Sequence, residues 1–162
     1  MRDKGMISVV TTMYKSAEYV EHFYARTLAV LRSIGIDKYE FVFVNDGSPD
    51  NSLDVALSLQ KKDPCVRVVD LSRNFGHHPA VFCGLSYVRG DHVFLIDVDL
   101  EEEPEYLSIF WRTLQDNPDA DVAYGVQTTR KGGVFERVTG QWFYRLFNML
   151  SHTCVVPNQT TA

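Results

Sequence analysis

The strongest constraint on the fold is a regular alternation of apolar and amphipathic segments along the 162 residues. Short runs rich in β-branched and aromatic residues predict strands over residues 6–12, 39–45, 66–71, 91–97 and 121–126. Apolar residues at helical spacing predict helices over residues 17–34, about 50–62, 79–88, 102–117 and 134–151. Such alternation is typical of a mostly parallel, Rossmann-like sheet with helices on both faces. We expect an α/β fold in a single domain over residues 1–162.

Composition excludes several classes of protein. The formal net charge is -5, and no Lys/Arg-rich run or nucleic-acid-binding motif occurs, so we expect no nucleic-acid partner. Three cysteines without paired spacing indicate neither a disulfide framework nor a zinc site, which favours a reducing, cytoplasmic setting. The first residues resemble neither a signal peptide nor a membrane span, and no apolar run reaches membrane-spanning length.

Polar clusters follow the predicted strands at the points where they end. They cover residues 11–15, 45–50, 73–78 and 97–101. In open parallel sheets ligands bind outside the carboxyl ends of the strands. The sequence therefore predicts that four loops converge on one ligand-binding rim.

Two aspartates, Asp97 and Asp99, end the apolar run "HVFLID" and lie one residue apart. Alternate residues of a strand point to the same face, so two such carboxylates can hold one hard cation, Mg²⁺ or Mn²⁺, together with phosphate oxygens. The alternative is a solvated acidic loop in which the acids at 101–103 begin a helix.

Other phosphate-binding folds fit the sequence less well. No G-x-G-x-x-G follows the first strand, and no G-x-x-x-x-G-K-[ST] occurs, so neither a Rossmann dinucleotide site nor a P-loop is expected. An aspartyl phosphatase also has a D-x-D after a strand, but that motif continues to Thr on the first strand. Here Leu100 follows, after the fourth strand, and the phosphatase stays a weaker alternative.

Three stretches together resemble a known family. They are "ISVVTTMYKS", "FVFVNDGSPDNS" and "LSRNFGHHPAVFCGLSYVRGDHVFLIDVDLEEEPE". In this order they are similar to the family 2 inverting glycosyltransferases, and within them to the polyprenyl-phosphate sugar transferases and dolichol-phosphate mannose synthases. The resemblance runs from about Ile7 to Asn158 and implies a nucleotide-diphospho-sugar transferase fold of the GT-A type.

The resemblance implies roles for individual residues. The base and ribose of a nucleotide donor are expected to contact Thr12, Tyr14, Asn45 and Asp46, with Arg73 close to the nucleotide. The metal and diphosphate are expected at Asp97, Asp99 and Glu101. The alternative for Tyr14 is an ordinary half-buried loop aromatic. We interpret Asp50 as a helix cap rather than a ligand, and His77 and His78 as structural or ligand-shaping rather than catalytic residues.

The chain departs from the family pattern in places that concern the donor. The Pro-x-Tyr-Asn-Glu loop of the family is replaced at residues 12–16, and Asn45 replaces the first Asp of D-D-G-S. In the loop after the fifth strand Gln127 stands where an Arg is common, but Arg130 is kept. Arg130 either stabilises the leaving diphosphate, together with the metal at Asp99, or is a solvated loop cation.

The implied activity is sugar transfer with inversion from a nucleotide-diphosphate donor, with UDP-sugars favoured, to a polyprenyl phosphate or glycan acceptor. It would serve the synthesis of cell-envelope polysaccharide or glycolipid. A non-catalytic nucleotide-sugar-binding module is the main alternative, because the chain looks like the donor-binding part of a longer protein. The apolar stripe of 134–151 packs on its own core, on a second subunit, or on the cytoplasmic face of a membrane. No residue stands out as general base.

Overall fold

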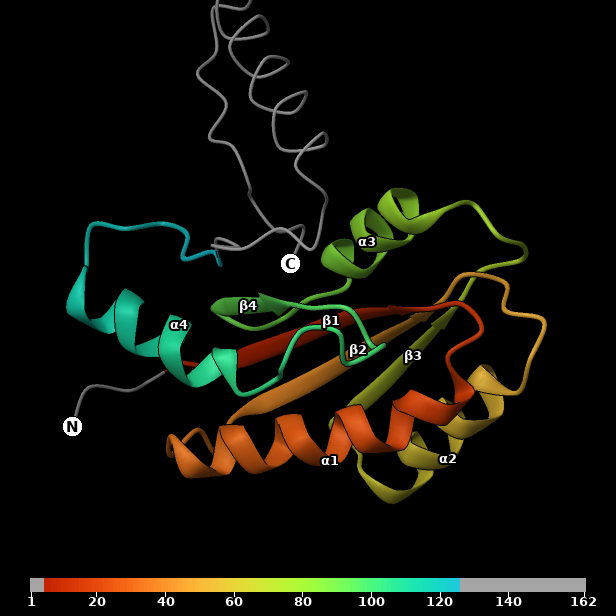
Figure 1. The fold of residues 1–162 in the computed structure, drawn as a ribbon, viewed down its shortest axis with the longest axis horizontal. Helices are drawn as coiled ribbons and strands as arrows, with labels where there is room; N and C mark the ends of the chain where they lie inside the picture. Colours follow the sequence, from red (N-terminus) through yellow and green to blue (C-terminus); the bar gives the residue numbers. More distant parts are fainter. Residues whose placement is uncertain (1–4, 126–162) are drawn as a thin grey trace, which may run out of the picture. The chain divides into compact units, whose positions relative to one another are not determined.

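The computed structural model describes residues 5–125 (Figure 1). Its elements are β1 (Ile7–Met13), α1 (Ala17–Ser33), β2 (Tyr39–Asn45), α2 (Ser52–Lys62), β3 (Val66–Asp70), α3 (His77–Ser86), β4 (His92–Leu95) and α4 (Tyr106–Asp116). Every strand and helix predicted before residue 118 is present, in the predicted order. Residues up to Asp119 form one compact unit, and a second unit begins at Ala120. None of the helices within residues 5–125 is long and apolar enough to cross a membrane.

The four strands form one parallel sheet in the order β3-β2-β1-β4. β1 pairs with β2 along its whole length, from Ile7 opposite Tyr39 to Met13 opposite Asn45. Its other edge pairs with β4, and β2 pairs with β3. Because all pairs are parallel, the carboxyl ends of the strands lie at one edge, which confirms the predicted Rossmann-like sheet.

Helices cover both faces of this sheet, with α3 on one side and α1 and α2 on the other (Figure 1). The larger core lies on the side of α1, α2 and α4, and its buried aromatic residues are Phe23, Phe41, Phe43, Phe94 and Trp111. The core under α3 is smaller and consists of Val10, Val42, Val44 and Ala80. A Cβ atom at Gly84 of α3 would lie 2.7 Å from a methyl group of Val10 and 2.9 Å from one of Val44. Glycine therefore allows α3 to approach the sheet closely.

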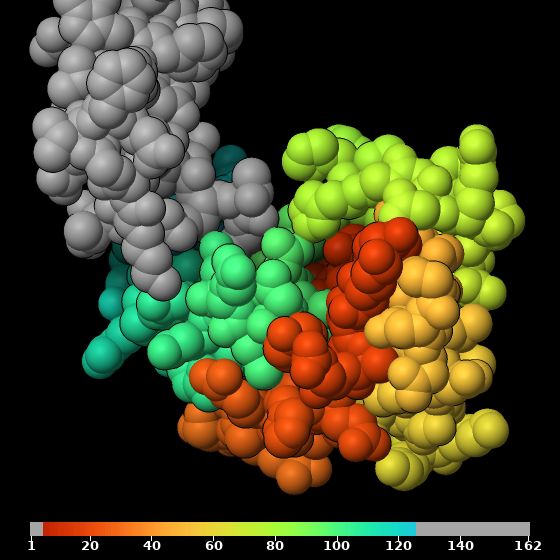
Figure 2. All heavy atoms as spheres, turned by 45° about the vertical axis from the view of Figure 1, so that its right-hand side comes forward, coloured from red at the N-terminus to blue at the C-terminus, as the bar shows by residue number. Residues whose placement is uncertain are grey.

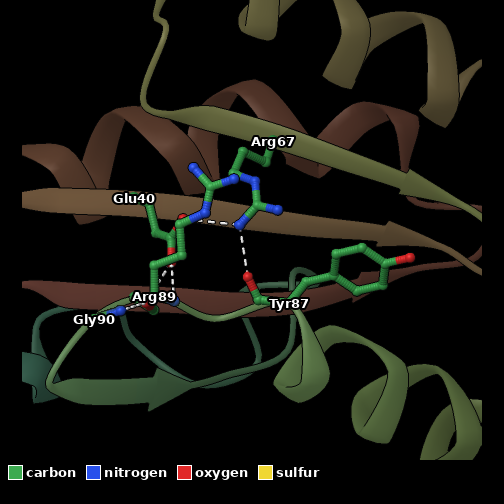
Figure 3. Close-up of polar contacts among 6 residues, drawn as sticks. Glu40, Arg67, Tyr87, Arg89 and Gly90 are labelled. Carbon is green, nitrogen blue, oxygen red and sulfur yellow. Dashed lines mark hydrogen bonds and ion pairs between the residues drawn. The ribbon is translucent and has the colours of Figure 1, made fainter.

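A buried ion pair ties the amino ends of the strands together on the α3 side (Figure 3). Glu40 of β2, only 3% exposed, accepts hydrogen bonds from Ser8 Oγ (2.7 Å), the Arg89 N–H (2.6 Å) and the Arg67 guanidinium (3.1 Å). Arg67 also donates to the carbonyl of Tyr87 at the end of α3 (2.6 Å). Burial alone would raise the pKa of Glu40, but these hydrogen bonds outweigh it and hold the pKa below its ordinary value.

The fourth strand ends earlier than the sequence predicts. β4 stops at Leu95, although the N–H of Ile96 still bonds to the carbonyl of Val10 (3.2 Å). The chain then turns at residues 98–99, and Leu100 adopts the left-handed conformation with φ of 62°. Asp97 and Asp99 are therefore not alternate residues of one strand, and the predicted common orientation does not follow from strand geometry.

The fourth helix begins later than predicted, at Tyr106 rather than at residue 102. Pro104 disfavours the helical conformation at the residue before it, so Glu102 and Glu103 precede the helix instead of forming its first turn. Glu105 occupies the N-cap position without a side-chain capping hydrogen bond. Its carboxylate instead forms a bidentate ion pair with Arg26 of α1, in which Nε lies 3.0 Å from Oε1.

The predicted fifth strand is wrong over its described part. Residues 121–125 contain no strand, and Val122 is 72% exposed. Alternating apolar residues suggest a strand, but a strand forms only where a neighbouring backbone supplies hydrogen-bond partners. Residue 126, Arg130 and the predicted helix over 134–151 lie outside the described residues.

Gly84→Val tests the close approach of α3. The added side chain would overpack the small core, and we expect the free energy of unfolding to fall by about 2 kcal/mol. Ser86→Val, on an exposed position of the same helix, is the control and should change the stability by less than about 0.5 kcal/mol. Equal effects of the two substitutions in urea denaturation would show that Gly84 is not a packing requirement.

Glu40→Gln tests the buried ion pair and its pH dependence. Because the folded pKa is lowered, the ionised carboxylate stabilises the fold above the unfolded pKa of about 4.3, and this stabilisation is lost as the pH falls through the folded pKa. At pH 7 we expect the free energy of unfolding of the variant to be about 2 kcal/mol lower than that of the wild type, since a glutamine at position 40 leaves Arg67 without its charged partner. Urea denaturation at several pH values should show that the stability difference between the wild type and the variant becomes smaller at acidic pH. A constant difference down to acidic pH contradicts the assignment.

Candidate functional site

The four polar loops predicted from the sequence meet at the carboxyl edge of the sheet. The space-filling view shows the residues after β1 (red), β2 (orange), β3 (yellow-green) and β4 (green) gathered on one face (Figure 2). Hydrogen bonds join the loops: the Lys15 N–H donates to Ser48 Oγ (2.7 Å) and the Ser16 N–H to Ser52 Oγ (2.9 Å). The convergence on one rim is thus confirmed for these loops.

Asp46 is the most enclosed acid of the rim, at 3% exposure. Its Oδ1 accepts the N–H of Phe75 (2.7 Å) and its Oδ2 the N–H of Gly76 (3.0 Å). The next residue, Gly47, has φ of 60°, and a Cβ there would lie 2.3 Å from the carbonyl carbon of Arg73. The loop after β2 therefore lies directly on the loop after β3, and Asp46 holds the latter through its backbone.

Asn45 is also buried and is engaged within the protein. Its Nδ2 donates to Asp70 Oδ1 at the end of β3 (2.8 Å), and its Oδ1 accepts the N–H of Ser48 (3.3 Å). An aspartate at position 45 would face the carboxylate of Asp70 with a like charge. This pairing gives a physical reason for Asn45 in place of the aspartate of the family pattern.

Asp50 links the starts of two helices, in agreement with its interpretation as a cap. Its carboxylate accepts the N–H groups of Ala17 at the start of α1 and of Ser52 at the start of α2, both at 3.1 Å, and the hydroxyl groups of Ser48 and Ser52. Partial burial would raise the pKa of Asp50, but these four hydrogen bonds hold it far below the ordinary value. Asp50 is therefore an ionised structural residue.

A short polar chain crosses the rim from β1 to the residues after β4. Thr12 Oγ1 lies 3.3 Å from His77 Nδ1, which lies 3.8 Å from Asp97 Oδ1. His77 comes from the first turn of α3 and so brings three loops together. Sequence analysis gave His77 only a structural or ligand-shaping role. The sequence feature that could have indicated a site role for His77 is its position directly after Gly76, whose φ of 97° permits the turn into α3.

Two exposed cation–aromatic pairs flank the rim. Lys15 Nζ lies 5.5 Å from the centre of the Tyr14 ring, and the Arg73 guanidinium lies 4.7 Å from the centre of the Phe75 ring. Tyr14 and Arg73 are thus accessible to a ligand, unlike Asn45 and Asp46. An aromatic face and a guanidinium can stack on a nucleobase or bind a phosphate.

The acidic residues after β4 influence one another electrostatically. Partial burial raises the pKa of Asp97, and the negative charges of Asp99 and Glu101 raise it further, although His77 opposes them. Burial and the same three carboxylates also raise the pKa of Glu102. A cation bound here would relieve this repulsion.

The three predicted metal ligands are not assembled into a finished cage. Asp97 is half-buried, Asp99 is exposed and accepts the N–H of Glu101 (3.0 Å), and Glu101 is exposed. Within residues 5–125 no three His, Cys, Asp or Glu side chains are grouped closely enough to hold a metal ion. The described residues could supply two or more hard oxygen ligands, which is the donor set that Mg²⁺ and Mn²⁺ prefer when phosphate oxygens and water complete the coordination.

Comparison with solved structures identifies the fold. The structure of the mannosyltransferase PcManGT from Pyrobaculum calidifontis, in complex with GDP-Man and Mn²⁺, is 19% identical and matches with a TM-score of 0.61 over 84% of this chain and 39% of that chain. Mannosyl-3-phosphoglycerate synthase from Rubrobacter xylanophilus is 22% identical, with a TM-score of 0.60 over 90% of this chain and 47% of that chain. The fold is of the GT-A type.

Sequence comparison identifies the family. A Mycobacterium tuberculosis (strain CDC 1551 / Oshkosh) protein that carries a glycosyltransferase name is 48% identical over 144 residues, 89% of this chain and 42% of that protein. The prophage bactoprenol glucosyl transferase homolog of Escherichia coli (strain K12) is 33% identical over 153 residues, 94% of this chain and 49% of that protein. The chain spans about half the length of these relatives. Residues 8–159 match the profile of Glycosyl transferase family 2, and the chain belongs to that family.

Proposed function

We propose that this chain forms the donor-binding part of a metal-dependent, inverting glycosyltransferase. The donor is a nucleotide-diphosphate sugar, with UDP-sugars favoured, and the acceptor is a polyprenyl phosphate at the cytoplasmic face of a membrane. Family membership and the similarity to proteins named bactoprenol glucosyl transferase support this reaction class. The product would enter cell-envelope polysaccharide or glycolipid synthesis.

The observation that carries the proposal is the rim itself. Exposed Tyr14 follows β1 and exposed Arg73 follows β3, whereas half-buried Asp97 and exposed Asp99 follow β4. His77 lies between Thr12 of β1 and Asp97. A nucleotide diphosphate has matching parts: a planar base for the aromatic and guanidinium groups, and a polyanion that needs a cation next to carboxylates. Asn45 and Asp46 would contribute indirectly, because their hydrogen bonds hold in place the loops on which the base would rest.

We propose that the carboxylates of Asp97 and Asp99 hold Mg²⁺ or Mn²⁺. Glu101, which follows the same turn, is the third proposed ligand. The raised pKa of Asp97 supports this, because a carboxylate crowded by other carboxylates gains most from a cation. When bound, the metal supplies positive charge to the leaving diphosphate. Arg130, outside the described residues, is proposed to supply more.

The reaction is a direct displacement at the anomeric carbon. An oxygen of the acceptor phosphate forms a bond to that carbon as the bond to the diphosphate oxygen breaks, and the electron pair leaves with the nucleoside diphosphate. A lipid phosphate is already anionic, so no general base needs to take a proton from it. Tyr14 and Arg73 would hold the nucleotide in place and so fix the orientation of the sugar.

A non-catalytic nucleotide-sugar-binding module is the second candidate. The exposed Tyr14 and Arg73 would serve such a module equally well, because they need only bind a nucleotide. Both candidates bind nucleotide, and only the first turns over. A sugar-transfer assay on a protein of the relatives' full length, with polyprenyl phosphate as acceptor, separates them.

Asp97→Ala and Asp99→Ala test the metal assignment. Isothermal titration calorimetry with UDP, GDP, CDP and dTDP should show binding that Mn²⁺ strengthens for at least one nucleotide. Each variant should lose at least about tenfold in affinity in the presence of Mn²⁺ and little in its absence, because only the metal-bridged contact is removed. Asp116→Ala, at the end of α4, is the control and should bind as the wild type does. The site is wrong if no nucleotide binds, or if Mn²⁺ still strengthens binding to both variants.

Asp46→Asn and Arg73→Ala, alone and combined, test whether Asp46 acts through the loop after β3. The asparagine presents an NH₂ group to one of the two backbone N–H donors, so we expect the loop to loosen and nucleotide affinity to fall by about tenfold. If Asp46 acts by holding Arg73 in place, the double variant should bind hardly less tightly than Arg73→Ala. Additive losses would instead indicate that Asp46 contacts the nucleotide directly.

A further inference from the structure

Helix α3 has two faces of very different character. Its inner face consists of small residues, and Ala80 and Gly84 are fully buried against the sheet. Residues half a turn away, at positions 78 and 82, must point outward. Phe82 is accordingly 71% exposed, more than any other phenylalanine or tyrosine in the part of the chain that the structure describes.

Further aromatic side chains extend this apolar surface at both ends of the helix. Phe75 precedes α3 and is 45% exposed, and Tyr87 follows it and is 46% exposed. The Tyr87 ring lies on the Arg67 side of the Glu40 ion pair, and its centre is 5.9 Å from the Arg67 guanidinium (Figure 3). We call this surface the outer face of α3, and it comprises Arg73, Phe75, His78, Phe82, Tyr87 and Arg89.

The charge around the outer face is opposite in sign to that of the chain. The chain has 21 acidic and 16 basic residues. Yet the stretch 71–90 contains no Asp or Glu, and no longer acid-free stretch occurs within residues 5–125. Arg73 lies against the Phe75 ring at one end, and at the other end the exposed Arg89 extends its side chain toward the Glu40–Arg67 pair (Figure 3). The Arg89 side chain takes part in none of the ion pairs found in the described range, whereas Arg67 is neutralised by Glu40.

From these observations we infer that the outer face of α3 docks on an anionic phospholipid bilayer. Exposed aromatic rings enter the boundary between head groups and acyl chains, and arginines beside them pair with lipid phosphates. A surface with one projecting phenylalanine, two flanking aromatic rings and arginines at both ends fits that boundary. The inference rests on the proposed function only in that a polyprenyl-phosphate acceptor is itself held in a bilayer.

The sign of the charge argues against a second copy of this chain as the occupant. In a symmetric dimer built on this face, the same patch contacts itself, so Arg73 and Arg89 of the two copies would come together without acidic partners on this stretch. An anionic lipid surface offers the complementary charge.

The position of the helix gives the docking a consequence for the site. α3 begins at His77, whose Nδ1 lies 3.8 Å from Asp97. A bilayer on the outer face would therefore border the rim at the amino end of α3. A phosphate at head-group level then has a short path to the carboxylates.

Vesicle co-sedimentation of the 162-residue chain tests the inference. Vesicles of phosphatidylcholine with and without phosphatidylglycerol are compared at low and high salt. The wild type should bind only the phosphatidylglycerol vesicles, and less at high salt. We expect Phe82→Ser to weaken this binding by about tenfold and Arg89→Gln by about fivefold. The matched controls are Ile109→Ser and Arg112→Gln, exposed residues of α4, which should bind as the wild type does.

Three outcomes would overturn the inference. The first is no binding to phosphatidylglycerol vesicles, or binding that Phe82→Ser and Arg89→Gln leave unchanged. The second is a concentration-dependent dimer that Phe82→Ser dissociates, seen by analytical ultracentrifugation. The third is a lower Tm of Phe82→Ser with unchanged vesicle binding, which would mean that other residues of this chain cover the face. Calorimetry with nucleotides in solution is run on the same variants, so a failure of docking and a failure of the proposed function are told apart.

Discussion

The parallel backbone ladder of β1 with β2 and β4 is the constraint on which the other features depend. Its register sets Met13 opposite Asn45, and the same ladder brings β4 to its end beside Val10. The polar loop that follows each strand therefore begins at the same edge of the sheet. Because a parallel sheet requires crossover connections, the helices pack on the two faces and leave this edge open.

Carboxylates at this edge serve two different purposes. The carboxylates of Asp46 and Asp50 accept hydrogen bonds from within the protein, and they hold loops and helix starts in place. Asp97 is half-buried and Asp99 is exposed, and their negative charges repel one another, so they gain from an external cation. Both kinds of residue belong to conspicuous motifs in the sequence, and only their partners separate the structural acids from those free to bind a ligand.

Helix α3 connects the rim with the rest of the molecule. Its small inner residues let it lie close on β1 and β2, which brings His77 to both Thr12 and Asp97. At its other end the Glu40 ion pair joins three strands to the connection between α3 and β4. The helix is thus fixed at both ends, and its aromatic outer face stands on a rigid support.

The order and type of the elements up to α4, the parallel sheet and the convergence of four loops follow from the sequence, because hydrophobic periodicity reports which face of each segment is buried. The end of β4, the start of α4 and the absence of a strand at 121–125 do not follow, since they depend on a turn at Leu100, on Pro104 and on backbone partners far along the chain. Motif positions indicated Asn45, Asp46 and Asp97 as site residues. Only the tertiary structure decided that Asn45 pairs with Asp70, that Asp46 holds the loop at Phe75 and Gly76, and that His77 reaches Asp97. Those contacts join residues about 20 to 30 positions apart, and sequence spacing carries no information about which side chains meet across a sheet.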